Sequence, residues 1–273
     1  MTRITEQTSK YRHLEKMEIE ELTLNINNED KLVAEAIEQA LPKLNSLIES
    51  IVSKITNGGR LFYVGAGSGG RLSVLDCIEL PTTFGIPGDL FNVILAGGKE
   101  HLIEAPEEKE DDVSAAWDEL QTLNVSAQDI VIGISASGTT PFVLSALTEC
   151  VKNKITTACI VSNPDSPIAA QSDISVEVIT GPEFISGSTR MKCGTAQKMI
   201  FDMISTTTMI RLGHVYDNQM VNVKLINDKI TDRAVKMLMK NTGIKDYNSA
   251  KELLIEAGSV KIAQEKYQLQ NSL

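Results

Sequence analysis

The sequence lacks the apolar segments that membrane and secreted proteins need. None of its 273 residues belongs to an apolar run approaching the 18 residues of a membrane-spanning helix. Its first residues, MTRITEQTSKYRHLEK, are polar and contain no stretch that resembles a signal peptide. The sequence therefore predicts a cytoplasmic protein that does not bind membranes.

Cysteine is scarce and basic residues are outnumbered. The four cysteines are scattered, form no CxxC pair and lie among apolar or small residues, which favours free buried thiols over zinc ligands or disulfides. The chain has 26 basic against 36 acidic residues, a net charge of −10. Because nucleic acids are bound through basic patches, this balance argues against a nucleic-acid partner, although a local pocket can still hold a small anion.

Five short apolar runs alternate with helix-length segments. They are 60–65, 91–96, 129–135, 155–162 and 174–180. Runs that are apolar on both faces are typical of a parallel sheet covered by helices on both sides. We therefore predict a doubly wound α/β domain.

Helical patterns surround these runs. The expected helical segments are 29–57, 191–213, 217–241 and a hairpin in the last thirty residues. Pro42 marks a kink or a break in the first of them, and Gly258 breaks the hairpin. We predict that residues 1–215 form the α/β domain with its N-terminal helices and that 216–273 form a short helical appendage.

A glycine-rich loop, GAGSGGRL, follows the first predicted strand. We expect the next helix to begin near Arg71, with Gly67, Ser68 and Gly69 in the loop before it. Ligands of open parallel sheets bind beyond the carboxyl ends of the strands, where glycines admit an anion and helix starts offer free amides. The second strand lacks the acidic residue of a dinucleotide site. The pattern favours a phosphate-binding loop, with a purely structural turn as the alternative.

A second loop, ISASGTTPF, ends the third predicted strand and is rich in hydroxyl groups. Its candidate phosphate-binding residues are Ser135, Ser137, Gly138, Thr139 and Thr140. Such loops are often only helix caps. Two of them on neighbouring strands, however, are suited to converge on one phosphate.

A third polar segment, GPEFISGSTRMKCGTAQK, follows the last predicted strand. Ser188, Arg190 and Lys192 are its candidates for binding a phosphate or sugar hydroxyls. For Lys192 a solvated helix start or an ion pair is the alternative interpretation.

Two acidic features are candidates for proton transfer. Glu79 lies among apolar neighbours in LDCIELPTTFG, a setting that suits a general acid or base. The segment EAPEEKEDD, residues 104–112, has the pattern of a solvated acidic surface, and its spacing singles out no member.

Several of these motifs together resemble one enzyme family. GGRLFYVGAGSGGRLSVLD, VIGISASGTTPFV and above all GPEFISGSTRMKCGTAQKMI resemble N-acetylmuramic acid 6-phosphate etherases, which are sugar isomerase (SIS) domain enzymes related to the glucokinase regulatory protein. The resemblance implies a five-stranded parallel α/β/α sandwich, a homodimer, a sugar phosphate at the strand ends, and no metal or other cofactor.

The resemblance also implies a reaction. It is cleavage of the lactyl ether of N-acetylmuramic acid 6-phosphate to N-acetylglucosamine 6-phosphate and D-lactate, a step of cell-wall amino-sugar recycling. The two carboxylates that the family uses correspond to Glu79, as proton donor, and Glu110.

The sequence departs from the family pattern at three positions. The family commonly has serine where Gly69 stands, a small polar residue in place of Ile78, and arginine in place of Thr139. Two alternatives therefore stay open. One is a non-catalytic sugar-phosphate-binding regulator that resembles the glucokinase regulatory protein, and the other is an aldose–ketose isomerase that uses His101 or His214.

Overall fold

The computed structural model describes residues 3–103, 106–222, 225 and 228–271. Two compact units make up the fold. The larger contains residues 1–77 and 89–205, and the smaller contains residues 78–88 and 206–273. Each is described by itself below, and the predicted domain boundary between 215 and 216 stays a prediction.

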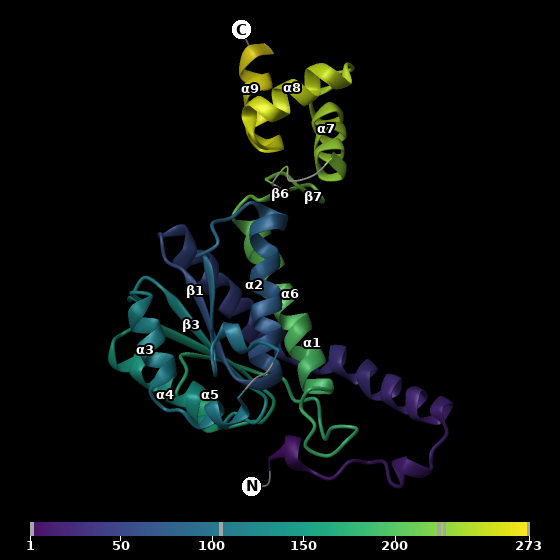
Figure 1. The fold of residues 1–273 in the computed structure, drawn as a ribbon, viewed down its shortest axis with the longest axis vertical. Helices are drawn as coiled ribbons and strands as arrows, with labels where there is room; N and C mark the ends of the chain where they lie inside the picture. The colour runs from purple at the N-terminus through teal and green to yellow at the C-terminus, as the bar shows by residue number, and fades with distance from the viewer. Residues whose placement is uncertain (1–2, 104–105, 223–224, 226–227, 272–273) are drawn as a thin grey trace. The chain divides into compact units, whose positions relative to one another are not determined.

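The larger unit is built on a five-stranded parallel sheet, as predicted. Its strands are β1 Leu61–Gly65, β2 Phe91–Leu95, β3 Ile130–Ser135, β4 Thr156–Val161 and β5 Ile174–Glu177. They lie in the order β2-β1-β3-β4-β5 (Figure 1). The order reverses between β1 and β3, and the carboxyl ends of strands at such a reversal leave a crevice where ligands bind.

Helices cover both faces of this sheet. They are α1 Ile19–Thr56, α2 Gly67–Phe84, α3 Ala115–Thr122, α4 Pro141–Lys152, α5 Pro167–Ala170 and α6 Lys192–Arg211. Figure 1 shows α3, α4 and α5 on one face and α1, α2 and α6 on the other. This is the predicted doubly wound arrangement. Within the described ranges no helix combines the length and the apolar character that crossing a bilayer requires.

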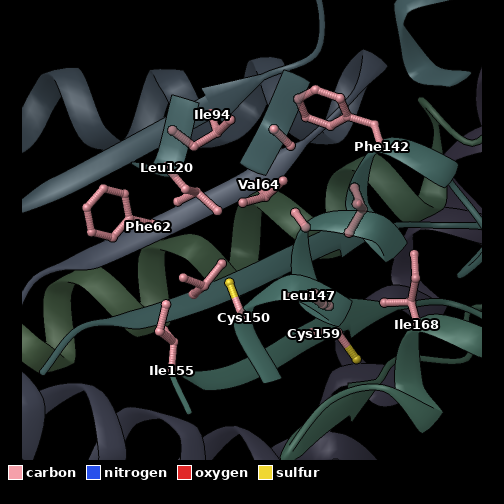
Figure 2. Packing of buried hydrophobic residues seen from close by; sticks show 14 of the residues in the cluster. Phe62, Val64, Ile94, Leu120, Phe142, Leu147, Cys150, Ile155, Cys159 and Ile168 are labelled. Carbon is pink, nitrogen blue, oxygen red and sulfur yellow. The ribbon is translucent and has the colours of Figure 1, made fainter. Parts of the chain in front are cut away.

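Apolar side chains of the strands pack against α3, α4 and α5. Figure 2 shows part of this core, in which Phe62, Leu120 and Leu147 are completely buried. A fully buried side chain of this size contributes about 1.5–3 kcal/mol to stability. The core thus holds the strands in register, and the register sets the position of the loops at their ends.

The glycine stretch after β1 differs from its prediction. Helix α2 begins at Gly67 rather than near Arg71, so most of these glycines form its first turn. Gly70 donates its amide to the carbonyl of Ala66, and a Cβ on Gly70 would lie 2.9 Å from the backbone of Gly65. Glycine therefore allows the helix to start directly against the end of the strand.

Pro42 does not break the first helix. Helix α1 runs through it and begins ten residues earlier than predicted. Proline removes one backbone donor, which leaves the carbonyl of Glu38 without its usual partner. Because Glu38 is exposed, water can satisfy that carbonyl.

The smaller unit contains a short hairpin and three helices. Its elements are β6 Val215–Tyr216, β7 Gln219–Met220, α7 Asp228–Thr242, α8 Tyr247–Ala257 and α9 Val260–Asn271. The hairpin replaces the predicted start of a helix at 217, because Asp217 takes a left-handed conformation that turns the chain. Residues 223–224 and 226–227 of that predicted helix lie outside the described residues. Gly258 ends α8 with a φ of 77°, which confirms the predicted break.

Candidate functional site

A cavity of about 740 Å³ lies at the carboxyl ends of β1 and β3. Its walls come from loops that follow the strands and from the N-terminal segment. The lining residues are Arg3, Glu6, Ala66, Gly67, Ser68, Gly69, Arg71, Glu107, Glu110, Asp111, Ile134, Ser135, Ala136, Ser137, Thr139, Thr140, Pro141, Gly187, Thr189, Arg190 and Gln197. The volume suits a ligand of sugar-phosphate size.

Most of the predicted site residues line this cavity. The predicted residues that do so are Gly67, Ser68, Gly69, Arg71, Glu110, Ser135, Ser137, Thr139, Thr140 and Arg190. The predicted residues outside the lining are Glu79, Gly138, Ser188 and Lys192. The structure thus brings together loops that are more than a hundred residues apart in the sequence, while the roles of the individual residues stay predictions.

Hydroxyl groups of the loop after β3 form a connected chain that ends on a carboxylate. The hydroxyl of Thr140 donates to Oε1 of Glu110 at 2.9 Å. Oγ1 of Thr140 lies 2.8 Å from Oγ of Ser135, which lies 3.2 Å from Oγ of Ser137. The hydroxyl of Thr139 donates to Oγ of Ser137 at 3.2 Å.

The hydrogen bonds of this series of hydroxyl groups all run in one direction, because each hydroxyl carries one proton. The proton of Thr140 is used toward Glu110, so Ser135 donates to Thr140 and Ser137 donates to Ser135. Ser135 and Thr140 are buried, whereas Ser137 and Thr139 are only half-buried. Thr140 holds the carboxylate of Glu110, and Ser135 supports Thr140. The outer two hydroxyls border the cavity, and each must turn its proton away from this series to donate to a bound phosphate.

Gly138 and the side chain of Asn163 fix the shape of this loop. A Cβ on Gly138 would lie 2.3 Å from Oγ of Ser166, so only glycine fits there, although Gly138 is absent from the cavity wall. Nδ2 of Asn163 donates to the carbonyls of Ala136 and Ser137 and to Oγ1 of Thr5. The N-terminal segment is thereby tied to the loop that carries the hydroxyl groups.

The acidic segment after β2 contributes Glu110 in a way its sequence did not reveal. Residues Glu107–Asp111 form a short 3-10 helix, η4, in which Glu107 is exposed and Glu110 is half-buried. Oε1 of Glu107 accepts from Arg71 at 2.9 Å. Most described residues of the segment are exposed, as its pattern predicts, but Glu107, Glu110 and Asp111 also line the cavity. Its residues 104–105 lie outside the described range.

Lys192 is buried beside a carboxylate and does not line the cavity. Its side chain is 1% exposed, and its Nζ donates to Oε2 of Glu29 at 2.6 Å. The carboxylate of Glu183 accepts from the backbone amides of Lys192 and Cys193 at the start of α6. This corrects the prediction of Lys192 as a phosphate ligand in favour of the ion-pair alternative. The physical reason is that its charge is already neutralised inside the protein.

The other predicted proton-transfer groups lie outside the cavity wall. Glu79 is exposed on α2, as is its neighbour Ile78, whereas Leu80 is buried. Nδ1 of His101 lies 2.7 Å from the carbonyl of Gly97, and Nδ1 of His214 lies 2.9 Å from that of Phe84. Neither histidine lines the cavity, which removes the support for the isomerase alternative.

Two residues of the cavity escaped the sequence analysis. Arg3 lines the cavity from the N-terminal segment, where no pattern marks it. Gln197 lines it from α6 and is 3% exposed. The available signal for Gln197 was a polar residue at a buried position of an apolar helix face, beside Ile200 and Phe201.

Comparison with known proteins finds relatives along nearly the whole chain. Residues 43–151 match the family described as glucokinase regulatory protein N-terminal SIS domain, and residues 111–206 match the SIS domain. A protein of Bacteroides thetaiotaomicron named N-acetylmuramic acid 6-phosphate etherase is 47% identical over 99% of this chain and 97% of its own length. Proteins with the same name from Porphyromonas gingivalis and Salmonella typhi are 49% and 44% identical, covering 96% and 85% of this chain and 96% and 78% of their own lengths.

Solved structures share the fold at low sequence identity. A phosphoheptose isomerase from Francisella tularensis has a TM-score of 0.53 at 17% identity, covering 73% of this chain and all of that one. A phosphoheptose isomerase from Neisseria gonorrhoeae has a TM-score of 0.52 at 15% identity, covering 69% of this chain and 97% of that one. These likenesses bear on the fold alone.

Proposed function

This chain belongs to the N-acetylmuramic acid 6-phosphate etherase family, and from that premise we propose how its cavity binds and cleaves an amino-sugar phosphate. The enzyme cleaves the lactyl ether of N-acetylmuramic acid 6-phosphate and yields N-acetylglucosamine 6-phosphate and D-lactate. One observation carries the proposal. It is a carboxylate, Glu110, held by a hydroxyl group in a cavity whose wall also offers glycine amides and serine hydroxyls.

The phosphate of the substrate binds between the two loops. Ser137 and Thr139 offer half-buried hydroxyls, and the first turn of α2 at Ser68 and Gly69 offers backbone amides. Arg190 is exposed, lines the cavity and has no ion-pair partner among the described residues, so its charge is available to an anion. Arg71 is already paired with Glu107 and contributes less net charge.

The reaction is an elimination followed by hydration on the open-chain sugar. A base removes the proton at C2, the electron pair forms the C2–C3 double bond, and the C3–O bond breaks as an acid protonates the departing lactyl oxygen. Water then adds at C3 and a proton returns to C2. We assign the base to Glu110 and the acid to Glu79.

A homodimer accounts for the position of the second carboxylate. Glu79 is exposed and is not part of the wall that contains Glu110, so a second copy of the chain is needed if it is to complete a cavity. We place the enzyme in the cytoplasm, in agreement with four cysteines that are all free thiols, three of them buried.

The activity is tested by D-lactate release from N-acetylmuramic acid 6-phosphate. We expect release by the wild-type chain and a loss of at least about a hundredfold for Glu110→Gln, because a positioned acid or base contributes about 10²–10⁴-fold. Glu108→Gln is the matched control, since Glu108 lies in the same 3-10 helix but is exposed and outside the cavity wall. Binding of the substrate without any lactate release would instead favour the regulator.

Mixing two inactive variants tests the contribution of the second subunit. If Glu79 of one copy completes the cavity of the other, refolded mixtures of Glu79→Gln and Glu110→Gln recover about a quarter of the wild-type activity. The reason is that half of the dimers are mixed and each mixed dimer has one intact site. Mixtures that stay as inactive as the separate variants would contradict the shared site.

A further inference from the structure

Gln197 carries a buried side-chain amide that the protein itself leaves without a partner. The residue lies on α6 and is 3% exposed, yet its side chain forms no hydrogen bond within the described part of the chain. Buried amides are normally hydrogen-bonded, because losing water without a replacement destabilises the folded state. The exposed remainder of Gln197 opens into the cavity.

The amide lies directly against the first turn of α2. A Cβ placed on Gly69 would lie 3.0 Å from Oε1 and 3.2 Å from Nε2 of Gln197. The amide of Gln197 therefore occupies the space beside the first turn of α2 into which a side chain at residue 69 would project.

We propose that Gln197 is a ligand-binding residue whose Nε2 donates a hydrogen bond to the phosphate of the substrate. Its amide has no partner within the described part of the protein and borders the cavity, where a bound phosphate can accept from it, and the donor stands beside Gly69, which has no side-chain donor. The inference rests on the proposed function for the nature of the anion. Its test, however, uses inorganic phosphate and requires no turnover.

A ligand-binding role and a structural role predict different effects on the stability of the empty protein. The amide of Gln197 forms no hydrogen bond within the described part of the protein and borders the cavity, so Gln197→Met leaves the melting temperature of the ligand-free protein nearly unchanged. The same variant weakens phosphate binding about tenfold, as the loss of one hydrogen bond to a charged group requires. A structural glutamine would give a lower melting temperature with unchanged phosphate binding.

The matched control is a buried polar side chain that has all its partners inside the protein. Thr157 on β4 is fully buried, and its hydroxyl donates to Asp173 at 3.0 Å. Thr157→Val is therefore expected to lower the melting temperature and to leave the dissociation constant for inorganic phosphate unchanged.

Two further substitutions test whether the Nε2 donor of Gln197 binds the phosphate and whether its position beside Gly69 matters. Gln197→Glu replaces the donor by a negative charge and weakens phosphate binding far more than Gln197→Met does. Gly69→Ala crowds both the amide of Gln197 and the side chain of Ile134 and weakens phosphate binding, and the part of this effect that acts through the amide is lost when Gln197 is already alanine.

Isothermal titration with inorganic phosphate and thermal unfolding without ligand decide the matter. The proposal is overturned if Gln197→Met binds phosphate as tightly as the wild type, or if Gln197→Glu does, since the amide would then accept from a sugar hydroxyl or serve packing alone. It is also overturned if the wild-type protein binds no phosphate at millimolar concentration. Failure of D-lactate release with these binding results intact would remove the etherase reaction and leave the assignment of Gln197 standing.

Discussion

Carboxylates at the cavity and carboxylates on the helices of the layer formed by α1, α2 and α6 have different kinds of hydrogen-bond partner. At the cavity, Glu110 is half-buried and accepts one hydrogen bond from the neutral hydroxyl of Thr140. In the helical layer, Glu29 is buried against the ammonium groups of Lys192 and Lys10. Asp76 is buried to a similar degree but receives only the hydroxyl of Ser205, and its Oδ2 has no partner.

Burial and the neighbouring groups together determine the charge of Glu29 and Asp76. Burial raises the pKa of Glu29, but hydrogen bonds and charge from Lys192 and Lys10 outweigh it and hold that pKa below its usual value. Burial raises the pKa of Asp76 to about 7, because the hydrogen bond from Ser205 opposes it only in part. The two carboxylates therefore differ near neutral pH, because Glu29 is charged whereas Asp76 is about half protonated at pH 7.

The largest effect on stability is expected from breaking the ion pair between Lys192 and Glu29. Lys192→Met leaves the buried carboxylate of Glu29 with only the exposed Lys10 as an ion-pair partner and lowers the free energy of unfolding by up to about 3–5 kcal/mol, measured by urea denaturation at pH 7. Lys198→Met is the control, because Lys198 is on the same helix and its pair with Asp202 is exposed. It should cost no more than about 1 kcal/mol.

The double variant Lys192→Met with Glu29→Met sharpens this result. Replacing both charges by apolar groups removes the uncompensated charge, so most of the lost stability should return. If the double variant is as unstable as Lys192→Met alone, the loss comes from packing rather than from charge.

The next effect concerns Asp76 and depends on pH. The raised pKa of Asp76 means that the folded state binds more protons than the unfolded state between pH 3.8 and about 7. The contribution of Asp76 to the free energy of unfolding is therefore fully present below that window. It falls as pH rises through the window, by about 1.4 kcal/mol per pH unit. Asp76→Asn removes this dependence.

Chemical denaturation at pH 4, 6 and 8 checks this expectation. The wild-type protein should lose stability relative to Asp76→Asn by on the order of 3 kcal/mol across the series, and most of the loss should occur below pH 7. Asp89→Asn is the surface control. Parallel curves for wild type and Asp76→Asn would show that Asp76 is charged throughout.

The smallest effect is expected at the cavity, where the hydrogen-bond partner of Glu110 is the neutral hydroxyl of Thr140. Thr140→Val removes the hydroxyl that orients Glu110 and lowers kcat for D-lactate release about tenfold, with a smaller change in KM. Thr140→Ser restores the hydroxyl and the rate, whereas Ser137→Ala raises KM. A Thr140→Val enzyme with unchanged kcat and a raised KM would place this hydroxyl on the phosphate instead.

The sequence predicted the sheet well, because β1 and β3 are buried on both faces and β2 and β4 nearly so, while β5 is partly buried. Each observed strand lies inside its predicted apolar run and loses at most a few residues at its ends. The short hairpin around Asp217 was missed because two-residue strands leave no periodic pattern. The continuous path through Pro42 could not be predicted either, since it depends on the exposure of the preceding turn.

The site was predictable where its residues follow strands and unpredictable where they depend on distant partners. The two loops were located because the carboxyl ends of neighbouring parallel strands meet at one edge. The partner of Lys192, Glu29, is 163 positions away, so no local pattern could identify the pair. Glu110 emerged only from the family resemblance, because its partner Thr140 belongs to another loop.

The side chain of Asn163 has a consequence for how the molecule folds. It donates to Thr5, 158 positions away, and to the hydroxyl loop, so one wall of the cavity closes only when the N-terminal segment has met the loops that follow β3 and β4. Contacts between such distant segments form late, because closing a long loop costs chain entropy before any contact compensates it. In refolding experiments we therefore expect helical circular dichroism to return before the capacity to bind phosphate.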